Sequence, residues 1–373
     1  MKRRKLGYAL LLLVGALLLS CCQRDGRSND GTHTSDTEAV TTEMIAYEST
    51  TLTSFESFLL HGRILPPTEE GLRIDWTYSG FTIQGWFDGE LIANVFSEGE
   101  LGFMLRVEVD GGESQPYCIP LGEQRVVLAT LTKGYHTVTV RKVSEGSTSR
   151  LILRSLEFCG KIDTPPEPPA FRMEIIGAST SCGVGSYPEE VTDRWDYLTH
   201  CDSYHAYTTM VARTLKADVN FVSVSGWGLV GGAAADKKIP AIYELTSYVS
   251  DSETKWDFAS WQADLVIITL GGNDRGAPAD LKRDYQRYAS DFLKTVRSKY
   301  PEAYILWHYG DENEELVPKI RAAVEEQQDD RIQFLCRPRN SDGGWSHADY
   351  ATHVTYAEDV LSALRTHWNI EAN

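Results

Sequence analysis

A proline-rich segment at residues 163–169 divides this chain into two halves with different sequence patterns. Four of its seven residues are proline, which can neither donate a hydrogen bond to a β-ladder nor continue a helix. We therefore expect a stiff, extended linker over residues 164–171. At 373 residues the chain is long enough for a separate hydrophobic core on each side of this linker.

The half before the linker, residues 45–163, is typical of an all-β domain. Turn residues separate short runs in which apolar and polar side chains alternate, at residues 81–87, 91–96, 103–109, 125–129, 136–142 and 150–158. Asp88-Gly89 between two such runs predicts a β-hairpin. Many short strands without helical periodicity predict a β-sandwich of the jelly-roll type. Trp76 and Trp86 are interpreted as packing residues, with a sugar-stacking surface as the alternative.

The half after the linker, residues 172–373, alternates buried strands with helices. Apolar runs lie at residues 173–176, 219–224, 265–270, 304–307 and 332–335, and helical spacing appears at residues 207–215, 281–300 and 352–368. This alternation predicts a parallel sheet covered on both faces. The predicted fold class is therefore an N-terminal β-sandwich followed by a three-layer α/β/α domain.

Ser179 is the candidate nucleophile. It follows a predicted strand that ends at Ile176, and the run breaks there into Gly177 and small hydroxyl residues. Open α/β sheets bind their ligands at the carboxyl ends of parallel strands, where a serine can act as a nucleophile. The alternative is a strand-to-helix turn in which Ser179 only caps a helix.

Three later residues supply the other groups that a serine nucleophile needs. Gly226 follows the second predicted strand, where the absence of a Cβ lets a backbone N–H approach a ligand. Asn273 follows the third strand and can donate its amide to an oxyanion, although a turn role is the alternative. His347 precedes the last helix and is the candidate base, in competition with His308 and His353.

In this order, Ser179, Gly226, Asn273 and His347 resemble the four defining residues of the SGNH, or GDSL-type, hydrolases. The two-domain arrangement and several short segments further resemble carbohydrate esterase family 2, namely residues 61–63, 88–89, 109–111, 134–138, 141–142 and 181–185. The resemblance extends over roughly residues 60 to 365, and its domain order is more diagnostic than any single motif.

This resemblance implies a carbohydrate esterase that removes acetyl groups from plant polysaccharides such as xylan or glucomannan, often at the 6-hydroxyl, without metal or cofactor. Ser179 would attack the acetyl carbonyl and His347 would take its proton. The Ser179 and Gly226 N–H groups and the Asn273 amide would hold the oxyanion. The aromatic residues Trp227, Trp345 and Tyr187 are candidate sugar contacts.

The chain departs from the family pattern at two supporting carboxylates. Ala178 stands where an Asp usually precedes the nucleophile, and Gly344 stands where an Asp usually precedes the His. We therefore predict a Ser-His dyad whose imidazole is oriented by a backbone carbonyl within residues 343–345, with Asp342 or Asp349 as alternatives. These departures also leave open a second function, a catalytically inactive glycan-binding lipoprotein on the cell surface.

The overall charge restricts the partners of this chain. With a formal net charge of -17 and a pI near 5.0, the protein repels polyanions. This argues against nucleic acids and anionic membrane surfaces as partners. A neutral or weakly charged substrate fits this balance better.

The N-terminus predicts export and lipid anchoring. Residues 2–5 are basic, residues 6–19 are apolar, and Leu18 to Cys22 resemble a bacterial lipobox. Residues 1–21 are thus a predicted signal peptide, with Cys21 as the preferred acylated residue because Ser20 is small, and Cys22 as the alternative. The predicted location is the cell envelope, with the membrane contacted only through the lipid.

Residues 22–44 are polar and are predicted to be a disordered tether. Five further cysteines follow, without metal-site spacing, and Cys182 with Cys201 can be either a disulfide or two buried thiols.

Overall fold

A computed structural model describes residues 47–186 and 200–371 of the chain. The predicted signal peptide, the tether, Cys21 and Tyr187 lie outside these ranges. Within them, no helix is both long enough and apolar enough to cross a membrane.

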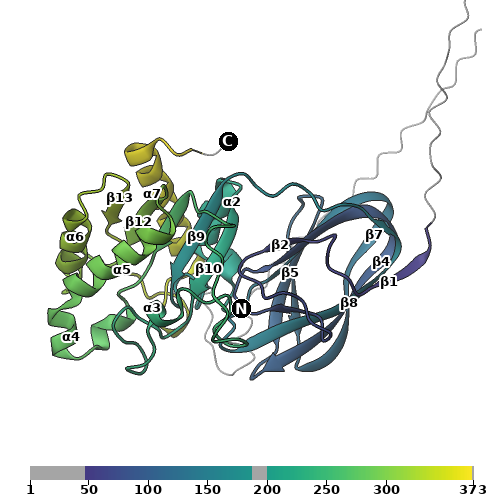
Figure 1. The fold of residues 1–373 in the computed structure, drawn as a ribbon, viewed down its shortest axis with the longest axis horizontal. Coiled ribbons are helices and arrows are strands. Elements are labelled where there is room, and N and C mark those ends of the chain that lie inside the picture. Colours follow the sequence, from purple (N-terminus) through teal and green to yellow (C-terminus); the bar gives the residue numbers. More distant parts are fainter. Residues whose placement is uncertain (1–46, 187–199, 372–373) are drawn as a thin grey trace, which may run out of the picture. The chain divides into compact units, whose positions relative to one another are not determined.

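The N-terminal half forms an eight-stranded antiparallel sheet that folds into a sandwich (Figure 1). The strand order is β1-β8-β4-β7-β5-β6, with β2 on β4 and β3 on β8. The strands are β1 Ser49–Leu52, β2 Leu59–His61, β3 Leu72–Ile74, β4 Gly80–Gly99, β5 Phe103–Val109, β6 Gln115–Ile119, β7 Gly122–Lys142 and β8 Ser149–Ile162. Their inward side chains, such as Phe81, Ile83 and Val140, are almost fully buried and build one core. The predicted β-sandwich is therefore confirmed.

The predicted hairpin at Asp88-Gly89 is wrong. Strand β4 continues through these residues, and its register against β7 shifts between Phe87 and Gly89. Gly89 has φ +92°, a left-handed conformation that glycine adopts without steric cost. The Asp-Gly pair thus accommodates a β-bulge, which bends the long strand β4 without ending it. The predicted runs at residues 125–129 and 136–142 likewise belong to the single strand β7.

The C-terminal half contains a five-stranded parallel sheet of order β10-β9-β11-β12-β13. Helices α5 and α6 pack against each other, as do α2 and α7, and together they cover the sheet (Figure 1). The strands are β9 Arg172–Gly177, β10 Asp218–Ser223, β11 Leu265–Ile268, β12 Tyr304–His308 and β13 Ile332–Leu335; the longer helices are α2 Tyr207–Thr214, α5 Tyr285–Lys299, α6 Val317–Glu326 and α7 Tyr350–Trp368. The three-layer α/β/α prediction is confirmed.

The strand predictions in this half agree with the structure because β9 to β12 are buried on both faces and their apolar runs are nearly continuous, whereas the edge strand β13 is half-buried. The predicted helix at residues 281–300 is divided in two, since α4 (Ala279–Arg283) ends at Asp284 before α5 begins. Between β8 and β9, the proline-rich residues 163–171 form neither helix nor strand.

A buried ion pair joins the two halves. The guanidinium of Arg63, which follows β2, lies 2.7 Å from a carboxylate oxygen of Glu174 on β9, and both side chains are fully buried. Tyr300 donates its hydroxyl to the same oxygen at 2.7 Å, and Arg63 also donates to the Leu245 carbonyl at 3.0 Å. Because each charge has lost its hydration, each depends on the other for compensation.

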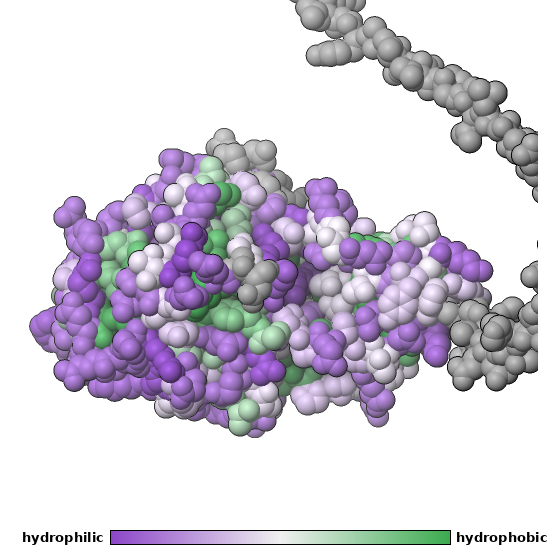
Figure 2. Space-filling model, turned by 90° about the horizontal axis from the view of Figure 1, so that it is seen from above, coloured by the Kyte–Doolittle hydropathy of each residue, from purple (hydrophilic) through white to green (hydrophobic). Residues whose placement is uncertain are grey.

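The surface is mostly hydrophilic, whereas the apolar residues gather in the two cores. Figure 2 shows hydrophilic side chains over most of one face, with smaller hydrophobic areas between them. Trp76 lies on the border of the two halves: it is fully buried, packs with residues of the α/β domain, and donates its indole N–H to the Thr246 carbonyl at 2.7 Å. Its interpretation as a packing residue is confirmed.

We expect Glu174→Gln to lower the free energy of unfolding by about 3 to 5 kcal/mol, because it leaves the buried Arg63 charge uncompensated. The measurement is equilibrium unfolding in guanidinium chloride. The matched control is Glu157→Gln, which removes a carboxylate from a surface pair with Arg125 and should have a much smaller effect. Equal stability of the two variants would contradict the role assigned to the buried pair.

Candidate active site

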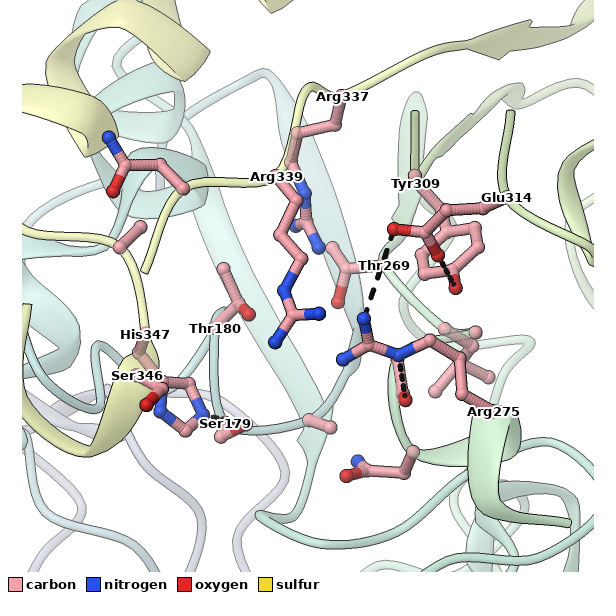
Figure 3. A pocket seen from close by; sticks show the side chains of 18 of the residues that line it. Ser179, Thr180, Thr269, Arg275, Tyr309, Glu314, Arg337, Arg339, Ser346 and His347 are labelled. Carbon is pink, nitrogen blue, oxygen red and sulfur yellow. Dashed lines mark hydrogen bonds and ion pairs between the residues drawn. The ribbon is translucent and has the colours of Figure 1, made fainter. Parts of the chain in front are cut away.

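The four predicted site residues lie in loops at the carboxyl edge of the parallel sheet. Strand β9 has β10 on one side and β11 on the other, so successive strands are added on opposite sides of β9. Such a switch point leaves a crevice beyond the strand ends. Ser179, Asn273 and His347 line one cavity of about 250 Å³ there (Figure 3), and Gly226 lies in the adjoining turn, next to the cavity residue Trp227.

The structure brings Ser179 and His347 into direct contact. The Oγ of Ser179 lies 2.7 Å from Nε2 of His347, and Nδ1 of His347 lies 2.9 Å from the backbone carbonyl oxygen of Trp345. A carbonyl oxygen can only accept, so Nδ1 carries the proton and Nε2 is left to accept the serine proton. The predicted orientation by a backbone carbonyl within residues 343–345 is confirmed.

Neither of the alternative carboxylates contacts His347. Asp349 is the N-cap of α7 and accepts the Thr352 N–H at 2.9 Å. Asp342 is exposed, and its N–H donates to the Asn340 side chain at 2.7 Å. The imidazole is therefore oriented by the main chain and not by an acidic side chain.

An unusual turn places the Trp345 carbonyl under the imidazole. Trp345 and Ser346 both have left-handed backbone conformations, with φ of 51° and 58°. Residues other than glycine rarely adopt this region, and it is found at functional sites that the surroundings hold in place. Hydrogen bonds close the turn, from the Gly343 N–H to the His347 carbonyl at 2.8 Å and from the Gly344 N–H to the Gly185 carbonyl at 3.1 Å.

Gly185 connects the nucleophile loop to this turn. A Cβ at this position would lie 2.1 Å from the Gly344 carbonyl oxygen, and φ is +72°. Only glycine permits so close an approach of two backbones. The glycine at the end of the 181–185 segment thus has a physical reason, which the motif alone did not reveal.

The environment of His347 favours its neutral form. Burial lowers the pKa of His347, while the Trp345 carbonyl and the negative charge of Glu145 act in the opposite direction. The competing histidines have other surroundings: His353 is fully buried with a pKa lowered by burial to about 3, and it accepts the Tyr207 N–H. His308 is also fully buried, against the ring of Tyr207.

Two carboxylates hold the loop that carries Gly226. Asp274, next to Asn273, accepts the N–H groups of Leu229 at 3.0 Å and Val230 at 2.8 Å. Glu145, from the sandwich segment between β7 and β8, accepts the Ser225 N–H at 2.8 Å and also the Ser225 hydroxyl. Both carboxylates are buried, so the loop is fixed from either side. Sequence reasoning assigned no role to either residue; the adjacency of Asp274 to Asn273 was the available signal, and Glu145 had none.

The two oxyanion candidates outside the nucleophile loop, Asn273 in the cavity and Gly226 in the adjoining turn, both have a free hydrogen-bond donor. Gly226 has φ +78°, which requires glycine, and its N–H forms no hydrogen bond with another described residue. The Asn273 amide donates one hydrogen bond to the Trp227 carbonyl at 2.7 Å, which fixes the side chain and leaves its second N–H for a ligand.

The remaining predicted site residues are divided between the cavity and other positions. Trp227 and Trp345 line the cavity, and Trp345 is 40% exposed, one of few large hydrophobic side chains so exposed in the described residues. Cys182 and Cys201 are buried thiols that pack beside Val184 and form no disulfide with each other. Among the residues that the structure describes, no cluster of His, Cys, Asp or Glu could hold a metal ion.

Residues 175–360 match the GDSL-like Lipase/Acylhydrolase family. The chain is 27% identical over 329 residues to the cellulase/esterase CelE of Acetivibrio thermocellus, which covers 82% of this chain but only 39% of that protein. It is 22% identical over 375 residues to an acetylxylan esterase / glucomannan deacetylase of Cellvibrio japonicus. That alignment covers 97% of this chain and 98% of the relative.

The similarity of fold extends over both domains. The solved structure of a family two carbohydrate esterase from Cellvibrio japonicus superimposes with a TM-score of 0.77 at 20% identity, covering 86% of this chain and 98% of that one. The α/β half of this chain is therefore a GDSL-like esterase domain of the serine carboxylic-ester hydrolase class, and several structural neighbours of the chain are family two carbohydrate esterases.

Proposed function

We propose that this protein is a carbohydrate O-acetyl esterase that works through a Ser179-His347 dyad and an acetyl-enzyme. The observation that carries the proposal is the continuous hydrogen-bond chain from Ser179 Oγ to His347 Nε2 and from Nδ1 to the Trp345 carbonyl. It supplies an activated nucleophile and a base already in its correct tautomer. The alternative of an inactive glycan-binding protein is not favoured, because glycan binding alone does not require a serine hydrogen-bonded to an oriented histidine.

The first half-reaction forms the acetyl-enzyme. His347 Nε2 takes the proton of Ser179 as Oγ attacks the acetyl carbonyl carbon, and the carbonyl oxygen becomes an oxyanion. The N–H groups of Ser179 and Gly226 and the Asn273 amide stabilise that oxyanion. The imidazolium then gives its proton to the departing sugar oxygen as the ester C–O bond breaks.

The second half-reaction releases acetate. A water molecule gives a proton to His347 and attacks the acetyl-enzyme, and the proton returns to Ser179 Oγ when acetate leaves. The imidazolium that forms in each half-reaction is stabilised by the Trp345 carbonyl dipole and by the charge of Glu145, in place of the missing carboxylate.

We assign acetylated plant polysaccharides of the xylan and glucomannan type, including acetyl groups at the 6-hydroxyl, as the substrates. The Cellvibrio japonicus relative, an acetylxylan esterase / glucomannan deacetylase, supports this assignment. Trp227 and Trp345 offer aromatic faces at the cavity on which sugar rings can stack. The predicted lipid anchor at Cys21 would hold the enzyme at the bacterial cell envelope, where polymeric substrates are encountered.

Replacing the nucleophile is the primary test. We expect Ser179→Ala to reduce acetate release from 4-nitrophenyl acetate by at least about 10³-fold, because no other group can form the acyl-enzyme. Ser298→Ala, an exposed position on α5, serves as the folding control. Comparable turnover by the two variants would refute the assignment of Ser179.

The oxyanion role of Asn273 gives a second test. We expect Asn273→Ala to lower kcat by about 10²- to 10³-fold with little change in KM, since the donor acts on charge that develops only in the transition state. Asn94→Ala, a partly buried amide on the sandwich, is the matched control. Full turnover by Asn273→Ala would show that the two backbone N–H groups suffice.

The pH dependence tests the environment of His347. Its base form is present above its pKa and is lost as the pH falls through it, so a lowered pKa extends activity below the ordinary histidine value of about 6.5. Glu145 raises this pKa and Arg337 lowers it. Glu145→Gln should therefore move the acid limb of kcat/KM to still lower pH.

Asp349→Asn is the comparison for that profile, because Asp349 caps α7 and does not contact the imidazole. An acid limb that stays in place in Glu145→Gln, or moves to higher pH, would contradict the electrostatic role of Glu145.

A further inference from the structure

Three arginines line the same cavity as the Ser179-His347 dyad. They are Arg275, Arg337 and Arg339, and among the described residues that line the cavity only Glu314 is acidic. The wall is therefore positively charged in a chain whose formal net charge is -17. Because charges in water are screened over about 8 Å at physiological salt, these near charges and not the distant total decide which groups bind there.

Two of the arginines are held by neighbours. Arg275 donates from Nε to the Gly272 carbonyl at 3.0 Å and lies 3.9 Å from Glu314, which also accepts the Tyr309 hydroxyl. Arg337 lies 5.5 Å from the ring centre of Tyr356 and also faces the ring of Tyr207. These contacts hold both side chains, yet among the described residues neither guanidinium has a bidentate carboxylate partner.

Arg339 has no side-chain partner among the described residues. Its backbone N–H donates to both carboxylate oxygens of Asp311 at 3.2 Å, which fixes the main chain. Its side chain is exposed and extends toward the centre of the cavity (Figure 3). A guanidinium presents five donors in a planar fork that matches a carboxylate, so the free Arg339 is equipped to bind one.

We propose that Arg339, with Arg275 and Arg337, binds a carboxylate of the substrate, and that the preferred substrates are acetylated glycans bearing uronic acid residues. This inference rests on the proposed esterase activity and specifies its substrate class. It revises the expectation of a neutral substrate that followed from net charge alone. Charge-assisted guanidinium–carboxylate hydrogen bonds are the interaction responsible.

The test compares acetylated xylo-oligosaccharides of one length with and without a glucuronic acid branch. For the unmodified enzyme, kcat/KM should be higher for the acidic oligosaccharide. That preference should shrink at about 0.5 M NaCl, because the Debye length falls to roughly 4 Å and the charges are screened. In Arg339→Gln the ratio of acidic to neutral kcat/KM should fall roughly tenfold, the effect of about 1.4 kcal/mol. Arg283→Gln, an exposed arginine on α4 outside the cavity, should keep the ratio of the unmodified enzyme.

A second arm distinguishes a carboxylate on the sugar from a carboxylate on the acyl group. It compares 4-nitrophenyl succinate with 4-nitrophenyl acetate in the same variants. A succinate preference that Arg339→Gln removes, without any preference for the acidic oligosaccharide, would overturn the uronic acid assignment.

An unmodified enzyme that hydrolyses the neutral oligosaccharide at least as well as the acidic one would overturn the whole inference while leaving the esterase activity intact. Failure to hydrolyse either oligosaccharide or 4-nitrophenyl acetate would instead refute the proposed function. The unmodified enzyme alone therefore decides the matter even if Arg339→Gln does not fold.

Discussion

The buried pair of Arg63 and Glu174 is the interaction on which the relation between the two halves depends. Glu174 occupies the first strand of the parallel sheet, a position where an isolated carboxylate would be very unfavourable. Its compensation comes from a sandwich residue more than a hundred positions earlier in the chain. Neither half can bury this charge alone, so the parallel sheet and the sandwich stabilise each other.

The same principle extends to the catalytic loops. Glu145 reaches from the sandwich to Ser225, and Asp274 holds the other end of the loop from the hydrolase domain. The position of Gly226 is thus set jointly by both halves. The sandwich thus helps to position a residue of the proposed oxyanion site, and the resemblance to the relatives covers both domains and not the hydrolase domain alone.

Local patterns predicted the parts of the structure that local physics controls. The strands of the parallel sheet were correctly predicted because burial in the sheet gives nearly continuous apolar runs. Ser179 could be found because it follows such a strand, and His347 because it precedes the last helix. The backbone orientation of the imidazole was predictable from the absence of a carboxylate at Gly344. Turn chemistry failed at Asp88-Gly89, since an Asp-Gly pair suits a bulge as well as a hairpin.

Long-range pairings remained beyond sequence reasoning. Nothing near Glu174 indicates Arg63, and nothing near Glu145 indicates Ser225, because their sequence separations are 111 and 80 residues. The arginines of the cavity come from two different loops, one after β11 and one after β13, so no single segment appears basic. The net charge, which averages over the whole surface, instead predicted a neutral or weakly charged substrate.

The left-handed turn at Trp345 and Ser346 gives the dyad a property that a Ser-His-Asp triad lacks. An aspartate that orients a histidine can itself take up a proton in acid, after which the imidazole loses its anchor. A peptide carbonyl does not titrate, so the tautomer of His347 is independent of acidity as long as the turn persists. The geometry of the base is thereby tied to backbone folding, and no single side-chain substitution can delete the group that holds it.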